Sequence, residues 1–396
     1  MRLLLSLCDT VKNLIMKLFD TLRMKKIRLG PYPDQIKILV CGPTLYELCH
    51  LGHARVLYFY DLMTRYFIYK GFHTITVVTI TDIDPKISAK AIGVDNSTQG
   101  VSDKFMIELL HDMSLLQIGR SFLLARVSDY VNVAIVLIKK LSSEKLAYSA
   151  SGNIYIDVRK VLRYGEMSGL SYDKIKELRI DIAANKRNPG DILLWNSINL
   201  SCQQFFEPAF GKGIPWWHIQ DASIAMSMFE GRYDVHGGGI ELIYPHHETI
   251  LGQLRALTNL ARPVNWWSHV GTVTIRGNKM SNSLSNTLKI RDLAREFLPN
   301  VIKLYLLSKH YREDLSFSRT HLKRYVAINN LIAESIVSEN DSDCISYSNK
   351  IFEKFQTYLD NDFDTQGALS ILLDGITNGI DRTILSKMTD IFGLYY

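Results

Sequence analysis

Two short motifs carry residues that suit phosphate chemistry. One holds His50 and His53 near the expected start of a helix, and the other holds Lys279 in a polar stretch over residues 276–286. Helix N-termini attract anions, and imidazole N–H groups placed there can donate hydrogen bonds to a phosphate. A lysine on a loop can reach over a triphosphate. Each motif could therefore contact phosphates, although either motif alone is more often an ordinary surface feature.

A glycine run supplies a further feature of a nucleotide site. Gly237, Gly238 and Gly239 follow a short run typical of a buried strand, and Glu241 stands two positions further on. Glycines let a backbone approach a ligand closely, and an acid after such a turn can hydrogen-bond a ribose. Many glycine runs are only turns, so this motif gains weight from the other two.

The composition is that of a large globular protein. At 396 residues, with 47% hydrophobic and 22% charged residues, the chain is long enough for two or three domains. The net charge of +6 permits an RNA partner without requiring one. No apolar run is long enough to span a membrane, so we expect no membrane partner. Five scattered cysteines favour a reducing compartment, and we expect a cytoplasmic protein, with organellar targeting by the N-terminus as the alternative.

Strand and helix patterns alternate through most of the chain. The expected strands are residues 36–40, 74–80, 153–157 and 234–240, and the expected helices are 101–116, 130–146 and 248–260. Residues 41–44 are expected to end the first strand. Such alternation is typical of a parallel α/β sheet. From about Arg291 only helices are expected, at 291–298, 301–309, 320–337, 347–359 and from 376 onward, with 338–348 as a linker.

Taken in order, the motifs resemble those of cysteinyl-tRNA synthetases, a branch of the class I aminoacyl-tRNA synthetases. The segments that carry the resemblance are 16–22, 41–55, 81–84, 186–195, 217–221, 234–239, 245–248, 279–283 and 310–312. The resemblance runs from about residue 16 to about residue 337, and several of its motifs are specific to the cysteine branch. It implies a Rossmann-like parallel sheet with an inserted connective region, followed by a helical region.

The resemblance also divides the chain. We expect an N-terminal extension at residues 1–15 and a catalytic domain at 16–290, with the insertion at about 120–205. A helical region that contacts the tRNA stem would follow at 291–337, and a short helical tail at 338–396. That tail is short for the family, so we expect poor discrimination of the anticodon. We expect a monomer.

The activity implied by the resemblance is that of a cysteine–tRNA ligase. Such an enzyme uses ATP with Mg²⁺ to activate cysteine and transfers it to the 3′ end of tRNA(Cys). By the match, His50, His53 and Lys279 are catalytic; Gly42, Gly237, Gly238, Gly239, Glu241, Ser281 and Asn282 bind the nucleotide; and Tyr46, Thr81, Trp217 and His236 form the amino-acid pocket.

The zinc site is where this chain departs from the family. The family holds zinc with two cysteines, a histidine and a glutamate, and the ion binds the substrate thiol, which excludes serine. The corresponding residues here are Cys41, Asp221, His246 and Ile250. An aspartate can ligate zinc but an isoleucine cannot, so we expect zinc to be weakly bound or absent. The alternatives for the missing ligand are Cys49, His247 and Glu248, which stand nearby in sequence.

Further departures leave two other functions open. Asn282 replaces the second lysine of the signature loop, and Glu241 replaces a shorter aspartate, so activity below the family's level is one expectation. A related ligase of the mycothiol pathway joins cysteine to an amino sugar without an anticodon domain. A catalytically impaired paralogue that acts as a binding module is the other alternative.

The helical region after the signature loop carries basic residues that suit RNA phosphates. They are Lys303, Lys309, His310, Arg312, Arg319, Lys323 and Arg324. The tail is acidic, with Asp341, Asp343, Asp360, Asp362 and Asp364, which disfavours a phosphate-binding surface there. We therefore expect tRNA contacts on the 291–337 segment that weaken with salt.

Overall fold

The computed structural model describes residues 16–29, 35–94, 97–178, 180, 185–197, 204–280, 287–337 and 345–396. The expected extension at residues 1–15 lies outside these ranges, as do Ser281, Asn282, Asp341 and Asp343.

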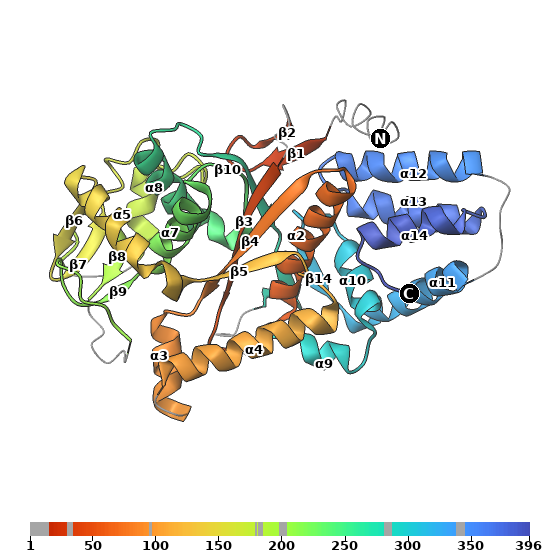
Figure 1. Ribbon diagram of the computed structural model, residues 1–396, viewed down its shortest axis with the longest axis horizontal. Coiled ribbons are helices and arrows are strands. Elements are labelled where there is room, and N and C mark those ends of the chain that lie inside the picture. Colours follow the sequence, from red (N-terminus) through yellow and green to blue (C-terminus); the bar gives the residue numbers. More distant parts are fainter. Residues whose placement is uncertain are drawn as a thin grey trace, which may run out of the picture.

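A five-stranded parallel sheet forms the centre of the molecule (Figure 1). Its strands are β3 (Gln35–Thr44), β4 (His73–Thr81), β5 (Phe122–Arg126), β10 (Tyr233–Gly239) and β11 (Val264–Val270). Their order across the sheet is β11-β10-β3-β4-β5, so the chain begins in the middle, runs to one edge and then returns to build the other half. Ligands of such sheets bind beyond the carboxyl ends of the strands where the order reverses, here between β3 and β10.

Helices cover both faces of this sheet because its strands alternate side chains between two cores. Ile38 and Val40 enter the core that includes α2 and α4, whereas Leu39 enters the core that includes α7 and α8. The helices are α2 (Leu51–Tyr69), α3 (Pro85–Val94), α4 (Thr98–Leu116), α7 (Trp217–Phe229) and α8 (Glu248–Thr258). The expected fold class, an α/β protein with a Rossmann-like parallel sheet, is confirmed.

A separate lobe interrupts the sheet between β5 and β10, at the left of Figure 1. It holds an antiparallel sheet in the order β6-β7-β8-β9, packed against α5. Its elements are α5 (Val131–Ser143), β6 (Ala147–Ala150), β7 (Asn153–Ile156), α6 (Tyr172–Leu178), β8 (Ile192–Asn196) and β9 (Ile214–Pro215). The insertion expected at about 120–205 corresponds to this lobe, but residues 122–126 are β5 and belong to the main sheet.

Two smaller sheets frame the core. The hairpin of β1 (Lys17–Asp20) and β2 (Lys25–Arg28) docks beside β11, where the Thr21 amide donates to Trp267 O over 2.9 Å. A mixed three-stranded sheet joins β12 (Val273–Ile275), β13 (Asn278–Lys279) and β14 (Leu315–Phe317). The presence of β14 corrects the expectation that only helices follow Arg291.

The C-terminal helices form a bundle beside the sheet, at the right of Figure 1. They are α9 (Ile290–Ala294), α10 (Pro299–Leu307), α11 (Arg319–Val337), α12 (Ile345–Asp360), α13 (Thr365–Thr377) and α14 (Arg382–Ile391). The sequence did not predict α13, and the expected linker at 338–348 is too long because α12 already begins at Ile345. The rest of that linker lies outside the described residues.

Helix α2 is fastened to this bundle along its length. The Tyr58 hydroxyl donates to Phe392 O over 2.8 Å, and the Tyr66 hydroxyl donates to Asp360 over 2.7 Å. Two residues after His53, the Arg55 guanidinium donates to the carbonyls of Gly271 and His310 over 2.9 and 3.1 Å. The active-site end of α2 and the bundle are thus joined through one rigid element.

The expected basic face is smaller than the sequence indicated. Lys303 is fully buried in α10 and donates to Gly393 O, and burial lowers its pKa to about 7. Arg312 pairs with the buried Asp362 at 2.9 Å. On α11, Lys323 and Arg324 remain exposed.

The acids of the tail also have structural partners. Asp362 accepts hydrogen bonds from the Phe19 amide and the Tyr311 hydroxyl, at 2.8 and 2.7 Å. Asp364 caps α13 through the Gly367 amide. Asp362 and Asp364 are therefore engaged in contacts within the protein.

Candidate active site

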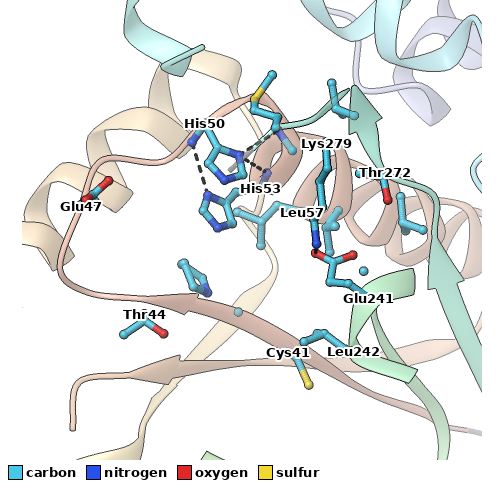
Figure 2. Close-up of a pocket in the computed structure, with 18 of the residues that line it drawn as sticks. Cys41, Thr44, Glu47, His50, His53, Leu57, Glu241, Leu242, Thr272 and Lys279 are labelled. Carbon is cyan, nitrogen blue, oxygen red and sulfur yellow. Dashed lines mark hydrogen bonds and ion pairs between the residues drawn. The ribbon is translucent and has the colours of Figure 1, made fainter. Parts of the chain in front are cut away.

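A cavity of about 600 Å³ opens at the carboxyl ends of the parallel strands, at the point where their order reverses (Figure 2). Its walls are the end of β3, the first turns of α2, the turn after β10, the segment after β11 and Lys279 on β13. Of the described residues that sequence analysis singled out, Cys41, Gly42, Tyr46, His50, His53, Gly239, Glu241 and Lys279 line it.

The wall formed by β3 depends on Gly42. A side-chain carbon there would lie 2.1 Å from Thr79 O on the neighbouring strand, so only glycine fits. The strand continues through this point to Thr44 with a shift in its pairing to β4. Sequence analysis expected residues 41–44 to end the strand. The structure corrects this, because β3 continues to Thr44 and pairs with Thr81 of β4 beyond the irregularity.

His50 and His53 shape the N-terminus of α2. The His50 ring accepts through Nδ1 from the Gly52 amide at 3.1 Å and the His53 amide at 3.4 Å, and it is the cap of the helix. The His53 ring returns the interaction by accepting from the His50 amide at 3.3 Å. The two rings stack with centroids 3.8 Å apart. Each ring is therefore fixed by the backbone that it caps.

These contacts define the protonation of both imidazoles. Burial, followed by the charge of Lys289, lowers the pKa of His50 to about 4, and burial holds the pKa of His53 well below its usual range. Both rings are neutral at pH 7. Because Nδ1 accepts in each ring, the proton is on Nε2, which is then available as a donor. The helix start presents two such donors where the helix dipole also favours an anion.

Lys279 faces Glu241 across the cavity. Their charged groups lie 3.8 Å apart and both side chains are about half exposed (Figure 2). The segments on either side of residues 281–286 are anchored: β13 pairs with β12, and Leu288 O accepts from the Leu51 amide over 2.9 Å at the start of α2. Lysine and histidine motifs are thus brought to one cavity. Lys86, which sequence analysis did not single out, also lines it.

The glycine run has two separate roles. At Gly239 a side-chain carbon would lie 2.4 Å from the Glu241 carboxylate, so this glycine makes room for the acid. At Gly237 it would collide with the Tyr60 ring, and at Gly238 it would lie 3.0 Å from the His247 ring. Gly237 and Gly238 therefore pack beneath the cavity, and only Gly239 of the three lines it.

The residues expected in the amino-acid pocket divide in a similar way. Tyr46 lines the cavity, whereas Thr81, Trp217 and His236 are not among its lining residues. Trp217 stacks on the His246 ring with centroids 4.4 Å apart, and His236 stacks on Trp267 with centroids 4.5 Å apart. These two aromatic contacts border a buried polar group that begins at Cys41.

That buried group converges on the Cys41 sulfur at the edge of the cavity. The Asp221 carboxylate lies 2.7 Å from Sγ, and three imidazoles approach through Nε2: His247 at 3.0 Å, His236 at 3.4 Å and His246 at 3.6 Å. The same oxygen of Asp221 lies 3.1 Å from His246 Nε2. All five side chains are buried. Sulfur, oxygen and imidazole nitrogen at such spacing are ligands suited to a transition metal.

Burial also sets the ionisation of this group. It raises the pKa of the Cys41 thiol well above its usual range, lowers the pKa of His236 to about 3, and holds that of His247 well below normal. For Asp221, burial alone would raise the pKa, but the hydrogen bond and charge of His246 outweigh it and lower the pKa. The lowered pKa values keep His236 and His247 neutral, which is the form that binds a metal.

The three alternatives for the missing metal ligand have different surroundings. Ile250 is fully buried in the apolar core under the sheet. The Glu248 carboxylate accepts from the Ser168 amide and hydroxyl at 2.8 and 2.9 Å, toward the inserted lobe. Cys49 is buried in the apolar core beside α2, and its backbone accepts from the Ile290 amide. Only His247 reaches Cys41.

Comparison with known proteins identifies the family of this chain. Residues 31–327 match the family described as tRNA synthetases class I (C) catalytic domain. The chain belongs to the class I tRNA synthetases of the cysteine branch. The cysteine–tRNA ligase of Pyrococcus abyssi is 33% identical over 386 residues, which cover 93% of this chain and 80% of that relative. The cysteine–tRNA ligase of Thermoplasma acidophilum is 33% identical over 369 residues, covering 90% and 81%.

Solved structures of this class share the fold at low identity. Mycobacterium tuberculosis methionyl-tRNA synthetase, in complex with methionyl-adenylate, matches with a TM-score of 0.67 at 13% identity, covering 87% of this chain and 82% of that one. The ternary complex of LeuRS from Agrobacterium radiobacter matches with a TM-score of 0.63 at 10% identity, covering 90% and 82%. Among the described residues, no helix is both long and apolar enough to cross a membrane.

Proposed function

We propose that this chain is a cysteine–tRNA ligase. In the first step the cysteine carboxylate attacks the α-phosphorus of ATP, the bond to the β-phosphate breaks, and pyrophosphate leaves with cysteinyl-adenylate formed. In the second step a tRNA 3′-terminal hydroxyl attacks the acyl carbon, and AMP leaves. The observation that carries this proposal is the joining of His50, His53 and Lys279 in one cavity whose other end is Cys41.

The phosphate end of the cavity is suited to the first step. The Nε2–H groups of His50 and His53 are held by backbone hydrogen bonds before any substrate arrives, so they need no reorganisation to meet charge that develops on the phosphate. The ammonium of Lys279 adds positive charge, as does Lys86 on the same cavity wall. Such fixed donors and charges are the main contribution of a protein to phosphoryl transfer.

The nucleoside is assigned to the turn after β10. Gly239 leaves space for a close approach, and the half-exposed Glu241 carboxylate can accept from ribose hydroxyls once Lys279 turns to the phosphates. Gly42 keeps the facing wall flat. ATP as the cosubstrate, with Mg²⁺ on its phosphates, follows from this assignment. Ser281 and Asn282 remain expected nucleotide contacts outside the described residues.

The amino-acid end fits the family's zinc. Cys41, Asp221 and His246 would hold the ion, and their sulfur, oxygen and nitrogen atoms already lie within 3.6 Å of one another. Zinc there would bind the thiolate of cysteine and not the hydroxyl of serine. Tyr46 on the cavity wall, together with Trp217 and His236 around the cluster, would shape the pocket for the remaining atoms of the substrate.

The tRNA is assigned to the side of the bundle that carries Lys323 and Arg324 on α11. Contacts of this kind are with phosphates, and they lose affinity steeply between roughly 50 and 200 mM salt. Binding of a cysteine tRNA and of an anticodon-swapped version, compared at fixed salt, tests whether the anticodon is read. A monomeric and cytoplasmic protein is part of the same proposal, supported by the scattered cysteines.

Amino-acid-dependent exchange of pyrophosphate into ATP, measured across all twenty amino acids, tests this function. We expect exchange with cysteine and little with serine. No exchange with any amino acid, from a folded protein, would contradict the proposal and leave the binding-module alternative. Transfer of cysteine to an amino sugar in place of tRNA would identify the mycothiol-type ligase.

A further inference from the structure

The apolar residue at position 250 leaves the proposed zinc one protein ligand short. Ile250 lies on α8 one turn after His246 and is packed among Leu39, Ala225 and Trp267. Its side chain has no ligand atom, and no rotation of it could provide one. Cys41, Asp221 and His246 supply three ligands, so a zinc site of four protein ligands needs a replacement from a residue already facing Cys41.

His247 occupies a suitable position for that replacement. Its Nε2 lies 3.0 Å from Cys41 Sγ, the shortest approach of the three imidazoles to the sulfur. It is adjacent to His246, so it reaches the cluster from the α8 side, as the missing carboxylate would have done. Cys41, His246 and His247 already have their ligand atoms within 4.8 Å of one another.

A chain of hydrogen bonds holds the His247 ring from behind. Its Nδ1 lies 2.7 Å from His269 Nε2, and His269 Nδ1 lies 2.7 Å from the Thr21 hydroxyl. This series of hydrogen bonds is complete when His247 Nδ1–H donates to His269 and His269 Nδ1–H donates to the Thr21 hydroxyl. The lone pair of His247 Nε2 then faces Cys41. Metal-binding histidines commonly donate their second N–H in this way, and such partners fix the ring and raise its basicity.

His236 is less suited to the vacant place. It lies on β10, and its Nε2 is 3.4 Å from the Cys41 sulfur. The residues with which it could share a metal ion are Cys41 and Asp221, and His246 is not among them. Its ring is held between Trp267 and the Tyr233 hydroxyl, which lies 2.5 Å from Nδ1. This residue borders the cluster on the side where Asp221 already supplies an oxygen.

We propose that His247 is the replacement ligand, so that this chain binds zinc through Cys41, Asp221, His246 and His247. His269 and Thr21 act as positioning residues for it. The inference rests on the proposed function only in the identity of the metal. The set has two anionic and two neutral ligands, so the zinc-bound site is formally neutral, whereas the family's two cysteines and glutamate supply three negative charges. A less anionic site makes the ion a stronger Lewis acid toward the substrate thiol.

The direct test is the metal content and coordination of the purified full-length chain. We expect about one zinc per chain by elemental analysis, and X-ray absorption at the zinc edge should show one sulfur and otherwise nitrogen or oxygen ligands. His247→Ala should lose most of the zinc, and His269→Ala should keep it with affinity reduced about 10- to 100-fold in competition with a chelator. His236→Ala is the matched control from the same cluster and should retain zinc.

A rescue variant distinguishes the loss of a zinc ligand from misfolding of the protein. His247→Ala combined with Ile250→Glu should regain zinc, because the carboxylate returns to the side that the imidazole left. Full zinc in His247→Ala with loss in His236→Ala would overturn the assignment, as would a wild-type protein that binds no added zinc. Pyrophosphate exchange is read separately: zinc bound as described with no exchange would contradict the proposed function but leave the ligand set intact.

Discussion

Two groups of histidines at opposite ends of one cavity use the same side chain in opposite ways. At the start of α2, His50 and His53 accept backbone N–H groups through Nδ1, which leaves Nε2–H as a donor for an anion. Around Cys41, His246 and His247 have Nδ1 in contact with another imidazole and direct Nε2 at a sulfur. Burial lowers the pKa of His50, His53 and His247, so these three rings are neutral. The partner of Nδ1, and not the residue type, decides whether a histidine serves an anion or a cation.

The largest expected effect comes from removing a phosphate donor, and it should leave the histidines around Cys41 unaffected. His53→Ala should lower the rate of pyrophosphate exchange by about 10²–10³-fold, since a preorganised donor is worth roughly 2.7–4 kcal/mol in the transition state. Zinc content should stay at the wild-type level. The measurement is exchange kinetics alongside elemental analysis, and equal exchange rates in both proteins would refute the catalytic assignment of His53.

Removal of the metal should affect only cysteine binding, at the Cys41 end of the cavity. After treatment with a chelator, the KM for cysteine in exchange should rise by about tenfold or more, equivalent to at least 1.4 kcal/mol of lost binding. The dissociation constant for ATP, measured by calorimetry, should not change, because the phosphate donors are backbone-held. Readdition of zinc should restore the KM. A parallel loss of ATP affinity would show that the two groups are coupled.

Replacing the helix cap sharpens the role of His50. His50→Ala should lower the free energy of unfolding by about 1 kcal/mol because the first turn of α2 loses its cap, whereas His50→Asn should lower it by only a few tenths, since asparagine is a good cap. Both variants lose the Nε2–H donor, so both should lose exchange activity. Urea unfolding gives the comparison, and equal stability of the two variants would argue against a capping role.

The last expected effect is in the pH dependence of stability. His50 has a pKa of about 4 in the folded protein and about 6.5 when unfolded, so the unfolded state binds more protons between these values. Stability should therefore fall as the pH drops from 6.5 toward 4, with no contribution above 6.5. For one half-buried ring the total is under about 3 kcal/mol. His50→Asn should show a shallower fall in urea midpoints over this range.

Much of the sheet follows from local sequence. The strands predicted at residues 36–40, 74–80 and 234–240 correspond to β3, β4 and β10. The first two are runs of apolar and β-branched residues, as expected of strands buried on both faces. The end of β3 could not be predicted from local sequence. Gly42 and Pro43 usually end a strand, and the irregularity there depends on pairing with β4. Helix α7 was missed because most of its side chains are buried, so its polar face is narrow.

The site was predictable where its chemistry is contained in one motif. His50 and His53 lie three residues apart and orient each other, so their placement is local. The cluster at Cys41 joins β3, α7 and the start of α8, and no sequence spacing indicates which imidazole faces the sulfur. The prediction that Lys303 is part of a basic face was wrong for a related reason. Helix α10 is enclosed on all sides, so the charged side chain donates to a carbonyl inside the protein. The two adjacent histidines after Pro245 were the available signal for His247.

Helix α2 has a geometric consequence for a two-step enzyme. Its first residues hold the phosphate donors, and near its other end Tyr66 and Lys70 hold Asp360 of the bundle. The helix has 19 residues, which at about 1.5 Å each gives a span of roughly 28 Å. It therefore fixes the distance between the reaction centre and the bundle. One inserted residue would rotate the two ends by about 100° against each other, so the length of α2 is as constrained as any catalytic side chain.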